Sequence, residues 1–379
     1  MQPDAVDVDV LVIGAGIAGA SIAYFLAPHA RVLVVEREAH PGMHSTGRSA
    51  ALFFGSYGSA QVRALTRASR PFLDAPPAGF ADHPILAPRG VTIVGGAHAE
   101  AAIADAFDVI RPHSPGARLL DAAAIRAQVP VLLEEAAHHG VSEPDAADID
   151  VNALHQGYLR GARRHGARIE CDVAVAHIAH TPSGWELDCG TRRLRAPLLV
   201  NAAGAWVDEV AALAGVAPIG IEPRRRSAFL FAPPPELACA RWPAVVDVDE
   251  RWYFKPDAGL LLGSSANADP VAPHDVQPEL EDIALGIERI EHATTLRIRR
   301  PTRTWAGLRS FVADGDLVGG FARGRAGFFW LAAQGGYGIQ TSAAMGEACA
   351  NLALGRPLPA HLQDAGLHAA MLAPRYADS

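Results

Sequence analysis

The sequence predicts a mixed α/β protein in which a parallel, dinucleotide-binding sheet near the N-terminus carries an inserted antiparallel sheet. Three observations predict this fold class. An apolar segment at 9–13 runs directly into a glycine-rich turn and an apolar helical segment at 20–26. Later stretches at 90–95, 252–254 and 260–263 have the β-branched and aromatic content of sheet strands. The chain of 379 residues exceeds the usual size of one hydrophobic core, so we expect two structural units.

The glycine-rich turn has the spacing of a dinucleotide-binding motif. It reads Gly14-Ala15-Gly16-Ile17-Ala18-Gly19 and lies between the predicted strand and the helix. In this motif the first glycine forms the turn, the second lets the backbone approach a pyrophosphate, and the third permits close helix packing. A second strand at 31–35 ends at Glu36 and Arg37, and a carboxylate there can bind a ribose. We therefore expect a Rossmann-like fold that binds NAD or FAD, with Ala18 also at the cofactor.

Composition limits the remaining classes of function. Hydrophobic residues make up 50% of the chain and charged residues 20%, which is typical of a globular protein. The formal net charge of −8 lacks the basic excess that nucleic-acid binding needs. No apolar run can span a bilayer and 1–10 does not resemble a signal peptide, so we expect a cytoplasmic protein without an integral membrane segment.

Metal binding is not expected either. The four cysteines are scattered without metal-ligand spacing. The acidic residues at 143–150 lack the glycine and the terminal glutamate of a calcium loop. We expect Asp150 to cap a helix over 151–165 instead.

The choice between NAD and FAD depends on a segment rich in Ser, Thr, Gly and Arg that follows the second strand. It reads His44-Ser45-Thr46-Gly47-Arg48-Ser49-Ala50-Ala51. Here the chain resembles the D-amino acid oxidase/dehydrogenase superfamily of flavoproteins, which includes glycine oxidase and sarcosine oxidase. The resemblance implies that the segment wraps the pyrophosphate and reaches the flavin ring. It also implies that the cofactor is FAD, which we expect to be bound non-covalently because no cysteine is placed to attach it.

Two later segments extend the resemblance over nearly the whole chain. Residues 200–206 resemble the turn that closes over the cofactor, with Ala203, Gly204 and Trp206 as contacts. Residues 334–340 resemble the C-terminal flavin loop, which opens a helix over 341–354 and supplies Gly335, Gly336, Tyr337, Gly338, Ile339 and Gln340. Val175, at the end of a strand predicted over 168–175, matches a backbone contact with adenine, although an ordinary core valine is an equal alternative. The bacterial D-arginine dehydrogenase type is the most similar subgroup, through 153–160, 305–311 and the C-terminal loop.

This pattern implies a discontinuous FAD-binding domain and an inserted substrate domain. The FAD-binding domain comprises 1–80, 145–222 and 305–379. The substrate-binding domain comprises 81–144 and 223–304, and contributes an antiparallel sheet.

The resemblance also implies a substrate site for an amino acid. Arg309 would bind the substrate carboxylate bidentately, with Arg226 as a second cation. Tyr57 and Tyr253 match phenols near the carboxylate and the amine, although both could instead be packing residues, and the Gly336 carbonyl would accept the amine. We expect hydride transfer from Cα to the flavin N5, giving an imino acid that hydrolyses to a 2-oxo acid and ammonia. No His, Asp or Glu stands out as a base, so we expect binding to promote loss of the amine proton.

The predicted side-chain pocket departs from the subgroup. Members that prefer basic D-amino acids carry a carboxylate where this chain has Val91. The pocket is expected to be lined by apolar residues, namely Leu52, Phe53, Phe54, Val91, Ala244 and Val246. An apolar wall offers a guanidinium or ammonium no partner. We therefore predict a hydrophobic D-amino acid substrate, such as D-Leu, D-Met or D-Phe.

Alternatives from other classes stay open at this point. A glycine- or sarcosine-oxidase-like enzyme would pass electrons to oxygen, and a flavin-dependent 2-hydroxy-acid dehydrogenase would need a base that the sequence does not show. A catalytically idle flavin-binding module is a third alternative. The electron acceptor, a quinone or another carrier, cannot be identified from the sequence, and contact with the inner face of a membrane is left open.

Overall fold

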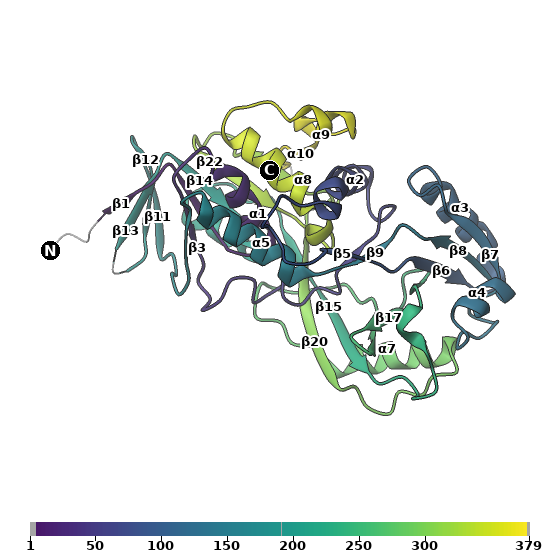
Figure 1. The fold of residues 1–379 in the computed structure, drawn as a ribbon. Coiled ribbons are helices and arrows are strands. Elements are labelled where there is room, and N and C mark those ends of the chain that lie inside the picture. Colours follow the sequence, from purple (N-terminus) through teal and green to yellow (C-terminus); the bar gives the residue numbers. More distant parts are fainter. Residues whose placement is uncertain (1–4, 191, 377–379) are drawn as a thin grey trace.

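The main sheet of the molecule is the predicted dinucleotide-binding sheet. The computed structural model describes residues 5–190 and 192–376, and within these ranges the strands form four sheets (Figure 1). The main sheet has six strands in the order β10-β3-β2-β14-β22-β21, and only the β21–β22 pair is antiparallel. Its strands are β10 (Arg168–Glu170), β3 (Val32–Val35), β2 (Val10–Ile13), β14 (Leu198–Asn201), β22 (Phe328–Ala332) and β21 (Val318–Phe321).

Both faces of this sheet are covered, which explains its uniformly apolar strands. Val10 and Val12 of β2 pack with helices on one face, whereas Leu11 and Ile13 pack on the other. The helices of the first face are α1 (Ile17–Leu26), α2 (Ala60–Asp74), α5 (Val151–Arg164) and α8 (Gly338–Ala353). The second face is covered by α6 (Val207–Leu213) and by a four-stranded sheet of β1 (Ala5–Asp7), β13 (Arg193–Ala196), β12 (Gly184–Asp188) and β11 (His177–Thr181).

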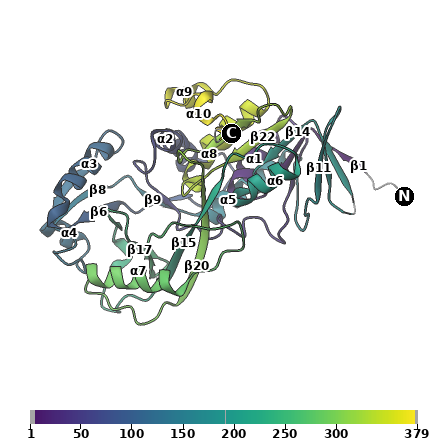
Figure 2. The same ribbon diagram turned by 180° about the vertical axis from the view of Figure 1, so that it is seen from behind.

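A nine-stranded sheet lies on the other side of the molecule from the four-stranded sheet (Figures 1 and 2). Its order is β19-β15-β18-β17-β16-β6-β8-β7, and β20 pairs with β15. The sheet is antiparallel except for the parallel β16–β6 pair, so the mixed α/β fold class is confirmed with this one departure. The strands are β19 (Asp269–Pro270), β15 (Glu222–Phe231), β18 (Leu260–Ser264), β17 (Tyr253–Asp257), β16 (Ala244–Asp247), β6 (Val91–Gly95), β8 (His139–Glu143), β7 (Arg118–Asp121) and β20 (Arg303–Phe311).

A small three-stranded sheet joins the two parts of the molecule. It consists of β4 (Leu52–Phe53), β9 (Ala147–Ile149) and β5 (Leu86–Pro88), and β9 leads from β8 into α5. The remaining helices are α3 (Glu100–Ile110), α4 (Ala122–Gln128), α7 (Leu280–Ala293), α9 (Ala360–Asp364) and α10 (Ala369–Leu372), with short 3₁₀ turns η1 (Ala97–Ala99), η2 (Gly204–Trp206) and η3 (Cys239–Arg241).

Several sequence expectations can be compared with these elements. Asp150 caps α5 as predicted, because its Oδ1 accepts a hydrogen bond of 2.7 Å from the Ala153 amide. The strand expected over 168–175 ends at Glu170 instead, since Asp172 adopts a left-handed conformation with φ of 56°. The predicted boundary at 305 falls inside β20, whose full pairing with β15 places it in the nine-stranded sheet. In the described ranges, no helix is long and apolar enough to cross a membrane.

Candidate active site

The glycine turn after β2 is built by backbone contacts that exclude side chains. Gly14 has a φ of 99°, and a Cβ there would lie 2.5 Å from the Ala202 carbonyl oxygen. A Cβ at Gly19 would lie only 1.8 Å from the Gly14 carbonyl oxygen. Gly16 faces the Thr46 side chain, whose Oγ1 would be 3.3 Å from an added Cβ. The first glycine therefore lets the turn pack against the residues that follow β14, the third packs helix α1 against the turn, and the second opens onto a cavity.

This cavity has a volume of about 350 Å³ and follows the carboxyl ends of the main-sheet strands. In parallel α/β folds, this edge of the sheet is where ligands bind. Residues predicted to contact the cofactor form much of its wall: Gly14, Gly16, Ala18, Glu36, Arg37, His44, Ser45, Thr46, Val175, Ala203, Gly204, Trp206 and Gly335. Gly19 and Gly47 are not part of the wall. Gly47 instead closes a tight turn by donating its amide hydrogen to the Gly42 carbonyl oxygen at 2.8 Å.

Sequence reasoning missed other residues of this wall. Val173 had a usable signal, because it follows β10 at the ligand-binding edge of the sheet. Met43 and Leu213 had none, since one lies in an irregular loop and the other at the end of α6. Glu38 also lines the wall, three residues after the end of β3.

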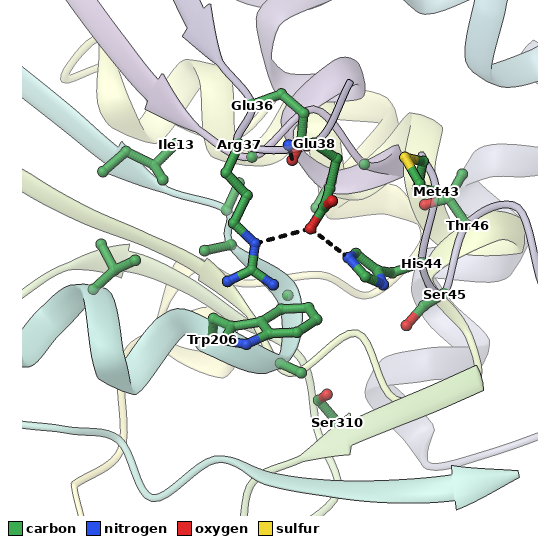
Figure 3. Close-up of a pocket in the computed structure, with 18 of the residues that line it drawn as sticks. Ile13, Glu36, Arg37, Glu38, Met43, His44, Ser45, Thr46, Trp206 and Ser310 are labelled. Atoms are coloured by element: carbon green, nitrogen blue, oxygen red, sulfur yellow. Dashed lines mark hydrogen bonds and ion pairs between the residues drawn. The ribbon is translucent and has the colours of Figure 1, made fainter. Parts of the chain in front are cut away.

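A polar and aromatic layer closes one side of the cavity (Figure 3). The Arg37 guanidinium lies 4.1 Å from the centre of the Trp206 ring, a cation–π arrangement. His44 Nε2 and Arg37 Nε both bind Glu38 Oε1, at 2.9 and 3.0 Å. The hydrogen bond from His44 is the largest cause that holds the pKa of the Glu38 carboxyl below its ordinary value. Burial opposes this effect, and the hydrogen bond from Arg37 adds to it.

Two polar groups at the cavity fit a dinucleotide. His44 Nδ1 is buried and has no hydrogen-bond partner among the described residues. Glu36 accepts hydrogen bonds from the backbone amides of Ala15 and Glu38, at 2.8 and 3.1 Å, which hold its carboxylate at the cavity wall. A buried ring nitrogen that makes no hydrogen bond, with Asp275 Oδ1 3.7 Å away, and a fixed carboxylate at the end of the second strand suit the phosphate and ribose groups of such a ligand.

The segment 44–51 attaches to the nine-stranded sheet as well as to the cavity. Thr46 Oγ1 accepts the first amide of helix α1, that of Ile17, at 3.0 Å. Ser45 Oγ donates to the Leu308 carbonyl oxygen at 2.7 Å. Arg48 does not face the cavity of the dinucleotide, because its guanidinium donates to the Val276 and Ala306 carbonyl oxygens and pairs with Asp275.

Two smaller cavities, of about 100 and 110 Å³, extend from the first one to the nine-stranded sheet. The 100 Å³ cavity shares Ser45, Thr46 and Gly335 with the dinucleotide cavity, and the 110 Å³ cavity adjoins the 100 Å³ one. They share residues from both parts of the molecule: Ser49, Ala50, Arg226, Tyr253, Arg309, Gly336 and Ile339. Gly338 lines one of them, and Ala51 and Tyr57 line the other. The predicted substrate residues are therefore brought together at the end of the dinucleotide cavity.

Two of the arginines on one face of the paired strands β15 and β20 line the smaller cavities, and the third, Arg224, does not. Arg226 lies opposite Gly307 in the register, and Arg309 lies opposite Arg224, so Arg226 and Arg309 share a face. Arg225 and Arg224 form ion pairs with Asp282 and Glu222, whereas none of the ion pairs found within 5–190 and 192–376 includes Arg226 or Arg309. Burial and, next, the charge of Arg309 lower the pKa of Arg226 to about 10. The cavity thus holds two guanidinium groups and favours an anion.

The aromatic residues beside the arginines form a stack. The centre of the Tyr57 ring lies 5.5 Å from that of Phe54, with the two rings stacked, and 5.2 Å from that of Tyr337, with the two rings edge to face. Tyr337 does not line these cavities, and burial raises its pKa to about 12. Gln340 lies at the wall, but its side-chain oxygen accepts the Phe54 amide at 3.0 Å and its nitrogen donates to Thr66 at 2.9 Å. Both residues support the Phe54 and Tyr57 turn, and their predicted cofactor contacts stay predictions.

Fewer of the predicted apolar residues line the substrate-side cavity than the sequence analysis expected. Leu52, Phe54 and Val246 line the cavity, together with Trp252 and Ile339. Val91 and Ala244 lie behind this wall, buried against Phe54, and do not reach the cavity. Phe53 points to the opposite side, into the cluster around Tyr158, because neighbouring residues of a strand alternate in direction.

One carboxylate in this cavity was not foreseen. Glu250, in the turn between β16 and β17, lines the cavity and accepts a hydrogen bond of 3.5 Å from the Tyr57 hydroxyl. No local sequence pattern identifies it, because the direction of a turn residue depends on how the strands pair. The described residues contain no group of three or more His, Cys, Asp or Glu side chains that could hold a metal ion.

A dinucleotide cavity that adjoins a small arginine-bearing pocket is the arrangement of a cofactor-dependent enzyme. Residues 9–352 match the family model DAO, described as FAD dependent oxidoreductase. The chain therefore belongs to the DAO family of FAD-dependent oxidoreductases, and its cofactor is FAD. The residues that fit this cofactor are the glycine cradle, Glu36 with its fixed carboxylate, and His44, whose buried Nδ1 makes no hydrogen bond.

Individual relatives are more distant. Hydrogen cyanide synthase subunit HcnC of Pseudomonas protegens is 28% identical over 242 residues, which cover 62% of this chain and 56% of that protein. Mitochondrial dimethylglycine dehydrogenase of Mus musculus is 28% identical over 127 residues, covering 33% of this chain and 15% of that protein. The match thus spans about half of the first relative and a small part of the second. Glycine oxidase from Geobacillus kaustophilus has the same fold, with a TM-score of 0.83 at 22% identity over 99% of this chain and 100% of that one.

Proposed function

We propose that this enzyme oxidises D-amino acids, and hydrophobic ones more readily than basic ones. The product would be an imino acid that hydrolyses to a 2-oxo acid and ammonia. The observation that carries the proposal is the pair Arg226 and Arg309, which have no carboxylate partner among the described residues and lie beside an apolar wall next to the FAD cavity.

Each group of the pocket has a task in this reaction. Bound FAD would supply the acceptor for a hydride from the substrate Cα. Arg309 would hold the substrate carboxylate through two parallel hydrogen bonds, which fix both its position and its rotation. The Gly336 carbonyl oxygen would accept a hydrogen bond from the amine, and Tyr57 and Tyr253 would border the carboxylate and the amine.

The substrate amine must be neutral before hydride leaves, because an ammonium group has no electron pair to form the imine. Two guanidinium groups close to the amine disfavour its charged form. Binding itself would therefore promote loss of the proton, and the pocket would need no dedicated base.

The names of relatives support the reaction class. Dimethylglycine dehydrogenase and glycine oxidase are both named for oxidation of an amino compound. The preference for the D-configuration, and the place of the chain in the D-arginine dehydrogenase type, rest on the sequence resemblance alone. The preference for hydrophobic side chains rests on Leu52, Phe54 and Val246, which offer a cationic side chain no partner.

Anaerobic mixing of the FAD-loaded enzyme with single amino acids tests this proposal. We expect D-Leu, D-Met and D-Phe to bleach the oxidised flavin band, and their kcat/KM values to exceed that of D-Arg by about tenfold or more. L-isomers at the same concentrations are the matched control. Bleaching by L-isomers only, or by no amino acid, would show that the proposed function is wrong. A preference for D-Arg over D-Leu would overturn only the side-chain assignment.

A second candidate is an amine oxidase of the glycine or sarcosine type that uses oxygen, which the fold shared with glycine oxidase favours. Production of hydrogen peroxide at the rate of substrate oxidation would identify it. We propose instead a dehydrogenase that uses a quinone or another carrier in the cytoplasm, and slow reoxidation of the reduced enzyme in air is the expected result. Bleaching by 2-hydroxy acids but not by amino acids would indicate a 2-hydroxy-acid dehydrogenase.

A further inference from the structure

Glu250 is held in a fixed and unfavourable backbone conformation at the mouth of the substrate pocket. Its φ is 54°, which costs a residue with a Cβ about 1 kcal/mol or more. The turn is tied together by the buried Asp247, whose backbone oxygen accepts the Glu250 amide at 2.8 Å and whose carboxylate binds the Arg251 side chain at 2.8 Å. A strained residue that its surroundings hold in place often marks a functional site.

The Glu250 carboxylate faces the same cavity as the two arginines. It accepts the Tyr57 hydroxyl, and it lines the cavity together with Arg226 and Arg309. Among the residues that line this cavity, it is the one carboxylate, and the two arginines are the cations. The Glu250 charge acts to raise the pKa of the Arg226 guanidinium. Burial and the charge of Arg309 lower that pKa by more, so the pKa is lowered overall.

The neighbouring residue Asp249 provides a comparison within the same turn. It is exposed, pairs with Arg251 at 3.4 Å and does not line the cavity. The two carboxylates are adjacent in sequence, yet Glu250 alone of the two contributes its charge to the wall of the pocket.

We infer that Glu250 limits the substrate pocket to one carboxylate and thereby excludes dicarboxylic amino acids such as D-Glu and D-Asp. This inference deepens the proposed function and rests on it for the class of substrate. The two guanidinium groups and the Glu250 carboxylate give the pocket a net charge of one positive unit. An amino acid with a neutral amine carries one carboxylate, and this carboxylate balances that charge. A second carboxylate would leave a net negative charge in a partly buried pocket, next to Glu250.

Removing the Glu250 charge should therefore strengthen the binding of a dianion more than that of a monoanion. Because Glu250 is exposed, its charge acts through a dielectric constant close to that of water, so that a unit charge at about 6–7 Å changes binding by about three- to fivefold. The effect on a ligand with two charges is larger. Because Glu250 is exposed, this difference should shrink as salt is added.

The test uses the FAD-loaded enzyme, its Glu250→Gln variant and the matched control Asp249→Asn. Binding of isovalerate and glutarate, which carry one and two carboxylates and cannot be oxidised as amino acids, is followed by perturbation of the flavin absorption band. In E250Q we expect the affinity for glutarate to rise about fivefold more than the affinity for isovalerate. In D249N we expect both affinities to stay within twofold of the wild type. Equal changes for the two ligands in E250Q, or the same gain in D249N, would overturn the inference.

A second measurement separates this inference from the proposed function. The ratio of kcat/KM for D-Glu to that for D-Leu should rise about fivefold in E250Q at low ionic strength. If no D-amino acid bleaches the flavin while glutarate and isovalerate respond as expected, the proposed function fails and the charge limit stands. If D-Leu is oxidised but the D-Glu ratio does not change, the charge limit is wrong and the proposed function stands.

Discussion

Gly336 gives the Arg309 guanidinium the space that it occupies. A Cβ at position 336 would lie 3.1 Å from Arg309 Cζ, so any side chain there would press against the group. The neighbouring Gly335 has a φ of 52° and donates its amide to the Ser310 carbonyl oxygen at 2.9 Å, which brings the C-terminal loop against β20. The loop and the arginine therefore define each other's position at the level of single atoms.

Replacing Arg309 with lysine tests whether the planar guanidinium is needed. Lysine keeps the charge but cannot form two parallel hydrogen bonds with one carboxylate. We expect kcat/KM for D-Leu to fall about 30- to 100-fold in R309K, mainly because KM rises. A fall of this size corresponds to the loss of one charged hydrogen bond. Steady-state kinetics would measure it. The matched control is R224K, since Arg224 lies opposite Arg309 in the register, pairs with Glu222 and is outside the cavity. An equal loss in both variants would contradict the assignment.

Single residues also show how far the sequence could be used. The resemblance named Arg226, Arg309 and Gly336 as substrate-site residues, and all three line one cavity. It placed Val91 in the cavity and overlooked Glu250. Both errors have one cause. The direction of a side chain depends on strand register and turn geometry, and these depend on the pairing of distant segments, which leaves no local signal in the sequence.

At the scale of elements, the turn that carries Phe54 and Tyr57 is held by side chains from other parts of the chain. Glu143 of β8 accepts the Gly55 amide at 3.0 Å and the Ser56 hydroxyl at 2.5 Å. From the other side, Gln340 of α8 accepts the Phe54 amide. Glu143 is 2% exposed, and burial is the largest cause that raises the pKa of its carboxyl. One wall of the substrate pocket thus depends on a buried acid.

The raised pKa of Glu143 makes a prediction for stability. The folded state favours the protonated form of Glu143, which therefore contributes to the free energy of unfolding. This stabilisation is fully present below the unfolded pKa of about 4.5 and is lost as pH rises through the folded pKa. Between pH 5 and pH 8, the Tm of the wild type should therefore fall relative to that of E143Q, which cannot ionise. Thermal unfolding at both pH values measures the difference, and E135Q, at an exposed position, should follow the wild type. A constant difference between wild type and E143Q would rule out this role.

The elements themselves were mostly predictable, but their grouping was not. The apolar strands β2 and β3, the helix α1 and the capped helix α5 each carry a local pattern. The strand β20 lies in a motif that resembles the flavin-binding part, yet it pairs with β15 along nine residues. Strand pairing is decided by the tertiary fold, so a motif can identify a segment without identifying its sheet.

At the scale of the whole molecule, the segment 44–51 joins the two large sheets at the place where the cavities meet. It caps helix α1 through Thr46 and contacts β20 through Ser45 and Arg48. The Trp305 indole also donates to the Arg48 carbonyl oxygen at 3.0 Å. A cofactor that contacts this segment therefore also stabilises the attachment of the substrate pocket, because binding favours the ordered arrangement.

Replacing Arg48 with alanine tests this link. The change removes the contacts with Asp275 and Val276, which hold the loop of 272–279 against the segment, and the contact with Ala306 of β20. We expect FAD to bind about tenfold more weakly, since part of its binding energy must then order the segment. Recovery of FAD fluorescence on dilution measures the affinity, and amide hydrogen exchange should quicken at 44–51 and 272–279 while the strands β2 and β3 stay protected. The matched control is R111A, which removes an exposed ion pair with Asp108 on α3. Unchanged FAD affinity and unchanged exchange in R48A would mean that the two sheets hold the segment independently of this arginine.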